Sequence, residues 1–302
     1  MTTPHAPVGT VGIVGLGTIA LTHTTVLRAL LPDARLVGVD PRGASASAAG
    51  AVDAVVPDLD AAPEVGLWVV ATPTHTHGPL AARLLTTTAA TVLVEKPLVA
   101  SASELAALDG VDPAAVEGRL RVAHHFAYSP EVRWAATVAP GPLRSVVSVF
   151  HDPYVRKSPE ELASYGSSWT DSGPNQLSML LRWVDDVTLA SVDDQGHRGH
   201  AAGTLGGGGT VTLVTSWYAA DSSKRTVLRY DDDIEVWLDH TAVTATKFRG
   251  GRPMAWLDDD GTTPRKVAHY RPLYEALLSG DDDELLRFDA ARRVVEQLRP
   301  GG

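Results

Sequence analysis

Continuous runs of apolar residues alternate with helical patterns through the first 125 positions of the chain. The apolar runs, rich in β-branched and aliphatic side chains, span residues 8–15, 34–39, 53–56, 67–71, 91–95 and 120–124. Apolar residues at helical spacing span residues 19–31, 79–87 and 101–108. Runs of this kind are typical of strands buried on both faces of a parallel sheet, with the helices as crossovers. The pattern predicts an α/β fold with a doubly wound parallel sheet.

The pattern changes near residue 125. After a helical pattern at residues 130–138, strand-like runs joined by short polar turns span residues 143–150, 187–192, 210–218, 225–230, 234–238 and 242–248. A last helix is predicted at residues 289–298. Consecutive β-runs predict an open, mainly antiparallel sheet in a second, α+β domain. We therefore expect two domains, residues 1–125 and residues 126–302.

The composition is ordinary, with 44% hydrophobic and 21% charged residues. The chain has no cysteine, which excludes disulfides and cysteine-ligated metals. No stretch approaches the ~18 apolar residues of a membrane span, and the N-terminus lacks the basic and apolar regions of a signal peptide. The net charge of −10, with no basic stripe, argues against nucleic acid as a partner. We expect a cytoplasmic protein that binds neither membranes nor nucleic acids.

The first predicted strand runs directly into GLGTIA at residues 15–20, which opens the first helix. This G-x-G-x-x-A order is informative when a strand precedes it and a helix follows. Gly15 permits the tight turn, and Gly17 lets a pyrophosphate approach the backbone at the helix N-terminus. The first half is therefore predicted to be a Rossmann domain that binds a dinucleotide through Gly15, Gly17, Thr18 and Ile19.

The second predicted strand ends in Asp40. An acid about 20 residues after the glycine turn is the expected partner of the adenosine ribose 2′-hydroxyl. Asp40 would repel a 2′-phosphate, so NAD is favoured over NADP as the cofactor. Arg42 either stacks on the adenine or meets that phosphate, which keeps NADP as the alternative.

The strand at residues 91–95 stops at Glu95-Lys96-Pro97. Ligands of open α/β sheets bind outside the carboxyl ends of the strands, so Lys96 is placed where chemistry would occur. The alternative is that Glu95 and Lys96 simply open a solvated loop.

The strand at residues 67–71 runs into the turn TPTHTHG at residues 72–78. The pair His75/His77 suggests a metal site, but no acidic residue lies nearby and the turn leads into a helix. We predict no metal, and we expect cofactor contacts from Thr72, Pro73 and His77, together with Glu95.

One helix in the second half departs from the β pattern. The segment WTDSGPNQLS at residues 169–178 places Asp171 and Asn175 one helical turn apart, near one face. Pro174 suits a first helical turn. Asp171 is either an N-cap beside a solvated Asn175, or both are site residues.

Taken together, GIVGLGTIA, ATPTHTH, VLVEKP and the downstream D-x-G-x-N helix resemble the glucose–fructose oxidoreductase/inositol dehydrogenase (Gfo/Idh/MocA) family. The resemblance implies an N-terminal Rossmann domain and a C-terminal domain whose open sheet lies against the substrate. It also implies that Lys96 is catalytic, and that the C-terminal sheet builds a homodimer or homotetramer.

Many members of the family carry histidine where this chain has Asn175. D-x-G-x-N-x-L-S at residues 171–178 is similar to the bacterial L-arabinose/D-galactose 1-dehydrogenases of the family, as is the V-R-K run at residues 155–157. The acidic residues before that run and the Trp-His after it are missing here. The candidate substrate contacts are His124, Arg156 and Trp169. Each also has a purely structural interpretation. His124 would be a satisfied buried histidine, Arg156 part of a solvated basic pair, and Trp169 a side chain packed beneath the helix.

The resulting hypothesis is an NAD-dependent sugar dehydrogenase that oxidises an aldose at C1 to a lactone. The amide of Asn175 does not titrate, so the base is Lys96 in its neutral form or Asp171, and Lys96 is the better candidate. The alternatives are a keto-sugar or imine reductase of the same fold, and a dinucleotide-binding regulator without catalysis.

Overall fold

The computed structural model describes residues 8–280 and 283–298, and it divides into two compact units. The first contains the described residues up to Ala123 and the segment Tyr270–Arg292, and the second contains His124–His269 and the residues from Arg293 on. The sequence predicts one break near residue 125 and does not reveal that residues 270–292 return to the first unit. Residues 1–7 and 299–302 of the expected domains lie outside the described residues. No helix in the described ranges is long and apolar enough to span a bilayer.

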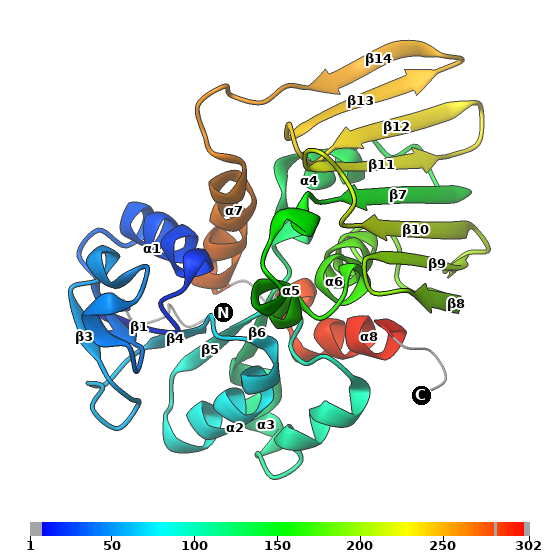
Figure 1. The fold of residues 1–302 in the computed structure, drawn as a ribbon. Helices are drawn as coiled ribbons and strands as arrows, with labels where there is room; N and C mark the ends of the chain where they lie inside the picture. Colours follow the sequence, from blue (N-terminus) through cyan, green and yellow to red (C-terminus); the bar gives the residue numbers. More distant parts are fainter. Residues whose placement is uncertain (1–7, 281–282, 299–302) are drawn as a thin grey trace. The chain divides into compact units, whose positions relative to one another are not determined.

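The first unit is built on six parallel strands in the order β3-β2-β1-β4-β5-β6 (Figure 1). They are β1 (Thr10–Val14), β2 (Arg35–Val39), β3 (Ala54–Val56), β4 (Leu67–Val70), β5 (Thr91–Glu95) and β6 (Leu120–Ala123). The unit's α-helices are α1 (Thr18–Leu30), α2 (His77–Thr87), α3 (Pro113–Arg119) and most of α7 (Arg265–Ser279). Its 3₁₀ helices are η1 (Gly43–Ser45), η2 (Ala49–Ala51), η3 (Thr74–Thr76), η4 (Ala102–Leu108) and η7 (Glu284–Leu286). The predicted doubly wound parallel sheet is confirmed.

Two local predictions in this unit are wrong. The helix expected at residues 101–108 is the 3₁₀ helix η4, because the Ser101 hydroxyl bonds the Glu104 carboxylate and caps no backbone N–H. The pattern also misses α3, whose N-terminus is capped by the Asp112 side chain on the N–H of Ala114.

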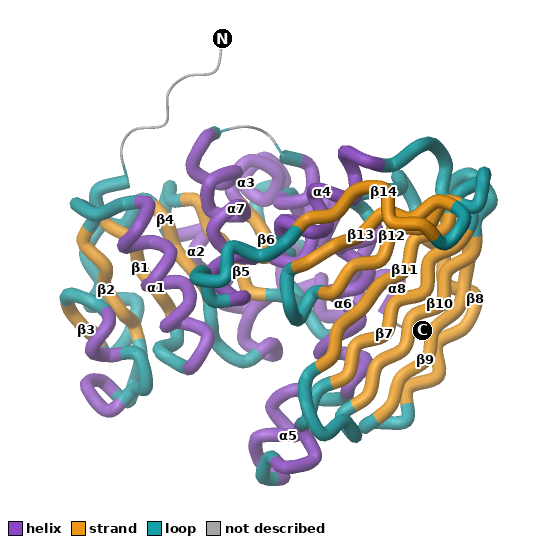
Figure 2. The backbone as a smooth tube through the Cα atoms, turned by 90° about the horizontal axis from the view of Figure 1, so that it is seen from above, coloured by secondary structure: helices purple, strands orange, loops and turns teal. Residues whose placement is uncertain are grey.

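The second unit carries eight strands in the order β14-β13-β12-β11-β7-β10-β9-β8, which Figure 2 shows side by side. They are β7 (Ser145–His151), β8 (Val187–Asp194), β9 (Arg198–Leu205), β10 (Thr210–Ser216), β11 (Ser223–Arg229), β12 (Ile234–Asp239), β13 (Thr244–Arg249) and β14 (Arg252–Leu257). The helices are α4 (Pro130–Val138), α5 (Pro159–Tyr165), α6 (Ser168–Leu180), α8 (Phe288–Leu298), η5 (His125–Tyr128) and η6 (Tyr154–Arg156). Only the central β7–β10 pair is parallel, so the predicted mainly antiparallel sheet is confirmed.

Side chains along these strands alternate between a buried and an open face. On β7, Val146 and Phe150 are buried in the core, whereas Val147 and Val149 on the other face are half-buried. The core lies under α4 and α6, where Leu177 and Leu180 join the inward strand residues. The fold thus places α6, which carries Asp171 and Asn175, on the covered face of the sheet.

Candidate active site

The glycine turn of the first unit has a backbone that only glycine accommodates. Gly15 has φ +88°, and a Cβ there would lie 2.8 Å from Cγ2 of Thr72 and 2.9 Å from the carbonyl oxygen of Ala71. Gly17 is the N-cap of α1 with no side-chain cap, and the space around it is open to 4 Å. The first N–H groups of α1, at Thr18 and Ile19, therefore point into a site that suits a pyrophosphate.

The carboxylate of Asp40 is fully engaged within the chain. Its Oδ2 accepts the N–H of Leu16 at 2.9 Å and Nη2 of Arg42 at 2.8 Å. Its Oδ1 accepts the N–H of Arg42 at 2.9 Å and Nε of the same residue at 3.0 Å. Four donors fill the roughly four lone-pair positions of a carboxylate. The Arg42 fork holds the pKa of the Asp40 carboxyl far below its usual range.

The turn after β4 is held by its own polar groups. The hydroxyls of Thr72 and Thr76 lie 2.6 Å apart, and the Thr76 hydroxyl donates to the Pro73 carbonyl at 2.7 Å. His77 is 1% exposed, and both of its ring nitrogens contact backbone carbonyls, so the predicted cofactor contact of His77 stays a prediction. In residues 8–280 and 283–298, no group of three or more histidine or acidic side chains is arranged to hold a metal ion.

Glu95 is buried and contacts side chains of the first unit. Its Oε1 accepts the Tyr270 hydroxyl at 2.7 Å and lies 3.0 Å from Nε2 of His23, whose Nδ1 lies 2.7 Å from the Tyr274 hydroxyl. Burial alone raises the pKa of the Glu95 carboxyl, but His23 and Tyr270 leave it below its usual value. Oε1 of Glu95 is thus engaged by side chains of α1 and α7, and the predicted cofactor contact of Glu95 stays a prediction.

Lys96 is half-buried where β5 leaves the sheet, directly after the buried Glu95 and before a cis peptide bond to Pro97. The position at the carboxyl end of a central parallel strand is the one expected for a catalytic side chain in this fold.

In the second unit, α6 begins earlier than its proline suggests. Ser167 caps the helix: its hydroxyl accepts the N–H of Thr170, and the Thr170 hydroxyl accepts the N–H of Ser167 at 2.8 Å. Asp171 is therefore not the N-cap, and Pro174 lies inside the helix and not in its first turn. Asn175 is 5% exposed, and its Oδ1 has no hydrogen-bond partner among the described residues. A buried acceptor without a donor is a candidate ligand contact.

The three predicted substrate residues differ in their surroundings. Trp169 is fully buried, and its Nε1 donates to the Leu298 carbonyl at 2.8 Å. The burial of the ring fits the packing alternative, and its predicted role in sugar stacking stays a prediction. His124 is 1% exposed at the start of η5, whereas Arg156 is exposed on η6.

The second unit also contains a buried ion pair that the sequence analysis did not predict. The Lys224 ammonium bonds the Asp152 carboxylate directly and lies 5.0 Å from the centre of the Phe150 ring. Asp152 also accepts the Ser222 hydroxyl at 3.2 Å. The sequence feature that could have revealed this pair is the alternation of buried and exposed residues along β11, which places Lys224 on the inward face.

The Asp171 carboxylate interacts electrostatically with Lys224 of this pair. Burial lowers the pKa of Lys224, while the carboxylates of Asp152 and Asp171 act in the opposite direction. Burial also raises the pKa of the Tyr154 hydroxyl, and the same two carboxylates raise it further. The inner face of the second unit thus gathers acceptors and donors around the N-terminal half of α6.

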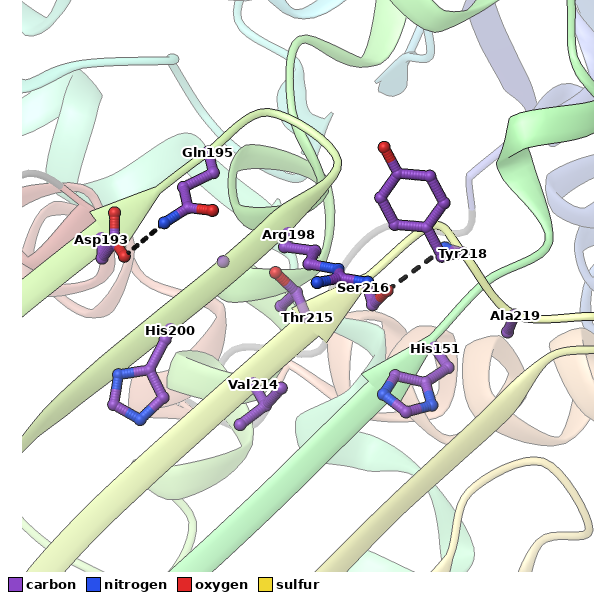
Figure 3. A pocket seen from close by; sticks show the side chains of 11 residues that line it. His151, Asp193, Gln195, Arg198, His200, Val214, Thr215, Ser216, Tyr218 and Ala219 are labelled. Carbon is purple, nitrogen blue, oxygen red and sulfur yellow. Dashed lines mark hydrogen bonds between the residues drawn. The ribbon is translucent and has the colours of Figure 1, made fainter.

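A separate cavity of about 490 Å³ lies on the opposite face of this sheet (Figure 3). His151, Val214, Ser216, Arg198 and His200 line it from neighbouring strands β7, β10 and β9. None of the residues predicted to bind cofactor or substrate belongs to it.

Comparison with known proteins adds the following findings. Residues 10–115 match the family model GFO_IDH_MocA, described as an oxidoreductase family with an NAD-binding Rossmann fold. A search of curated proteins found no match.

Several solved structures share the fold over nearly the whole chain. UDP-N-acetylglucosamine 3-dehydrogenase from Acidithiobacillus ferrooxidans is 20% identical, with 96% of this chain and 95% of that chain covered and a TM-score of 0.77. A myo-inositol dehydrogenase from Corynebacterium glutamicum is 19% identical, with coverages of 96% and 93% and a TM-score of 0.74. An inositol dehydrogenase homologue from Azotobacter vinelandii, complexed with NADH and myo-inositol, is 19% identical, with coverages of 98% and 94% and a TM-score of 0.76.

Proposed function

We propose that this chain is a sugar dehydrogenase of the Gfo/Idh/MocA family of NAD-binding oxidoreductases, whose model matches residues 10–115. The specific reaction we propose is oxidation of an aldose at C1 to a lactone. The proposal is carried by Lys96, a half-buried lysine at the carboxyl end of β5 in a sheet whose glycine turn is open for a dinucleotide. Nucleotide binding is assigned to residues 1–125, and substrate binding to the domain that follows.

The residues of the first unit fit the cofactor. The backbone at Gly15, Gly17, Thr18 and Ile19 would hold the pyrophosphate, Asp40 and Arg42 would meet the adenosine ribose, and the turn at Thr72 and Pro73 would line the nicotinamide end. When bound, the nicotinamide supplies the hydride acceptor, which no side chain can replace.

The proton is handled by the chain itself. In this proposal neutral Lys96 accepts the proton of the substrate hydroxyl, and Asp171 orients that hydroxyl and stabilises the ammonium that forms. Asn175 orients a second hydroxyl through its buried amide, since an amide does not titrate. An anomeric hydroxyl is more acidic than an ordinary secondary alcohol, so C1 oxidation tolerates an asparagine where many family members have histidine.

The polar side chains of the second unit support a sugar-like substrate. Asp152, Tyr154 and Lys224 offer acceptors and donors in the neighbourhood of Asp171, which suits a molecule with several hydroxyls. The named dehydrogenases that share the fold carry inositol or an N-acetylhexosamine in their names.

The open face of the eight-stranded sheet supports self-association. Trp237 on β12 is 50% exposed and Trp256 on β14 is 64% exposed, next to half-buried valines on the same sheet. We propose a homodimer or homotetramer that buries this face, because large exposed apolar patches mark interfaces. Size-exclusion chromatography of Trp237→Glu should show a smaller species than the unmodified chain.

The experiment that tests the function is a panel of aldoses with NAD⁺, followed by the absorbance of the reduced nicotinamide. We expect turnover of at least one aldose and a loss of about 10²–10⁴-fold in kcat for Lys96→Met, the range of a general base. Binding of NAD⁺ by calorimetry should survive that substitution. Near-normal turnover of Lys96→Met would remove the catalytic assignment. Cofactor binding without oxidation of any sugar would favour a keto-sugar or imine reductase, or a regulator.

A further inference from the structure

His77, the first residue of α2, lies between the two strand exits of the nucleotide-binding unit. Its Nδ1 lies 2.9 Å from the carbonyl oxygen of Pro97, and its Nε2 lies 2.8 Å from the carbonyl oxygen of Thr72. Pro97 follows Lys96 in the turn after β5, and Thr72 lies in the turn after β4. The imidazole therefore spans the turn that holds the candidate base and the turn that would line the cofactor.

Both partners of this ring are acceptors only. A backbone carbonyl oxygen cannot donate, and a neutral imidazole carries a single N–H. In the neutral ring one of the two contacts would set a nitrogen lone pair against a carbonyl oxygen at less than 3 Å, as the two distances show. Both contacts are hydrogen bonds only when both nitrogens carry hydrogen.

The charged groups around the ring come from two neighbouring elements. Burial and the Lys96 ammonium lower the pKa of His77, and the two carbonyl bonds and the Glu95 carboxylate offset this only in part, so the pKa stays below its usual value. Glu104 of η4, which packs on α2, is engaged by the Ser101 hydroxyl and the Ala100 N–H. The protonated ring is therefore favoured most when Lys96 is neutral, which is the form that a base requires.

We propose that His77 is a positioning residue that ties the Lys96 turn to the cofactor turn through two donated hydrogen bonds, and that it shares one positive charge with Lys96. Loss of the Lys96 proton strengthens the bridge, and uptake of the substrate proton weakens it. The kinetic part of this inference rests on the proposed function, whereas the bridge is a property of the chain without cofactor or substrate.

The bridge is tested by long-range ¹H–¹⁵N correlation spectra of the histidine-labelled, cofactor-free protein, with His77→Gln identifying the signal. We expect a ring with two nitrogen-bound hydrogens at about pH 5, and a midpoint for loss of one of them that rises by about one pH unit in Lys96→Met. A neutral tautomer at about pH 5 in both proteins would overturn the bridge. This result does not depend on whether the protein oxidises a sugar.

The kinetic part is tested by the pH profile of kcat/KM in the oxidation direction. In His77→Gln the neighbouring cation is lost, Lys96 holds its proton more tightly, and the acid limb should move up by about half to one pH unit. His75→Gln, an exposed histidine two residues away, is the matched control and should leave the limb in place. A lower kcat/KM with an unmoved limb would show a merely structural role and refute the shared charge. If Lys96→Met keeps its activity, the proposed function fails while the spectra still decide the bridge.

Discussion

Replacing Arg42 with alanine should change which dinucleotide the protein prefers. In the structure the guanidinium fork occupies one acceptor position on each oxygen of the Asp40 carboxylate. The ribose 2′-hydroxyl of NAD needs such a position, so NAD binds the unmodified chain only by displacing the fork. A 2′-phosphate makes the opposite demand, because its partner is the guanidinium and the carboxylate repels it.

The expected changes in dinucleotide affinity follow from how exposed the side chains of Arg42 and Asp40 are. The Arg42 side chain is 57% exposed, whereas that of Asp40 is 4% exposed, so water compensates the arginine when the pair opens. An ion pair with such an exposed partner costs about 0.5–1 kcal/mol to break, which gives about 2–5-fold tighter NAD⁺ binding in Arg42→Ala. A charge-assisted phosphate contact contributes about 1.5–3 kcal/mol, so NADP⁺ should bind about 10–150-fold more weakly.

The assay is isothermal titration of NAD⁺ and NADP⁺ into the unmodified chain and the variant at one fixed ionic strength. Arg28→Ala is the matched control, because Arg28 pairs with Asp53 at 2.7 Å in the same unit and does not touch Asp40. Both affinities should be unchanged in that control. Weaker NAD⁺ binding by Arg42→Ala, with NADP⁺ weakened equally, would place Arg42 on the adenine and refute the competition for Asp40.

Three further substitutions test the second unit. Trp169→Phe removes a buried hydrogen bond and part of a packed ring, so urea unfolding should show a loss of about 2 kcal/mol while the KM for the sugar stays constant. Lys224→Met leaves the Asp152 carboxylate buried and unpaired; the chain should lose about 3 kcal/mol of stability, and adding Asp152→Leu should recover most of it. Burial lowers the pKa of His269 to about 4, below its value of about 6.5 in the unfolded chain. The unfolded state therefore binds more protons between these values, and stability should fall by up to about 3 kcal/mol as the pH falls from about 6.5 to 4. His269→Gln should flatten that slope in pH-dependent thermal melts.

The central strands β1, β4 and β5 of the first unit could be predicted because they are buried on both faces. A continuous apolar run then marks the strand, and β1, β4 and β5 lie where the runs place them. The glycine turn could be predicted for a related reason, since Gly15 has a positive φ and its Cβ would clash with the turn after β4.

The strand β9 could not be predicted from apolar residues, because its inward positions carry glycine where neighbours come too close for a side chain. A Cβ on Gly203 would lie 2.1 Å from the Thr188 carbonyl oxygen, and one on Gly199 would lie 2.8 Å from Cβ of Trp169. The close approach of β8 and α6 thus removes the side chains that an alternation pattern needs. Helix α7 was not predicted for another reason. Tyr270 and Tyr274 are partly polar, so they do not mark a buried face in the sequence. In the structure they are buried and hydrogen-bonded to Glu95 and His23.

Buried polar residues at the strand exits show what local sequence cannot predict. His77 and Glu95, both near strand exits, were predicted to contact the cofactor, yet both ring nitrogens of His77 and Oε1 of Glu95 have partners within the unit, the latter 175 residues away in the chain. Local sequence shows that a polar group is buried at an exit, but not whether its partner is the protein or a ligand.

The register of a strand helps to tell a buried polar group with a protein partner from one with a ligand partner. Lys224 occupies an inward position of β11 with Thr226 and Leu228, and a lysine there requires a buried carboxylate, since desolvating an unpaired ammonium costs several kcal/mol. That carboxylate is Asp152, which directly follows β7, and the Asp171 carboxylate also favours the charged form of Lys224. A charged residue at an inward register position therefore identifies a polar cluster before its partner is known. Under the proposed function, it identifies the part of the second unit that would offer donors and acceptors to a polyhydroxylated substrate.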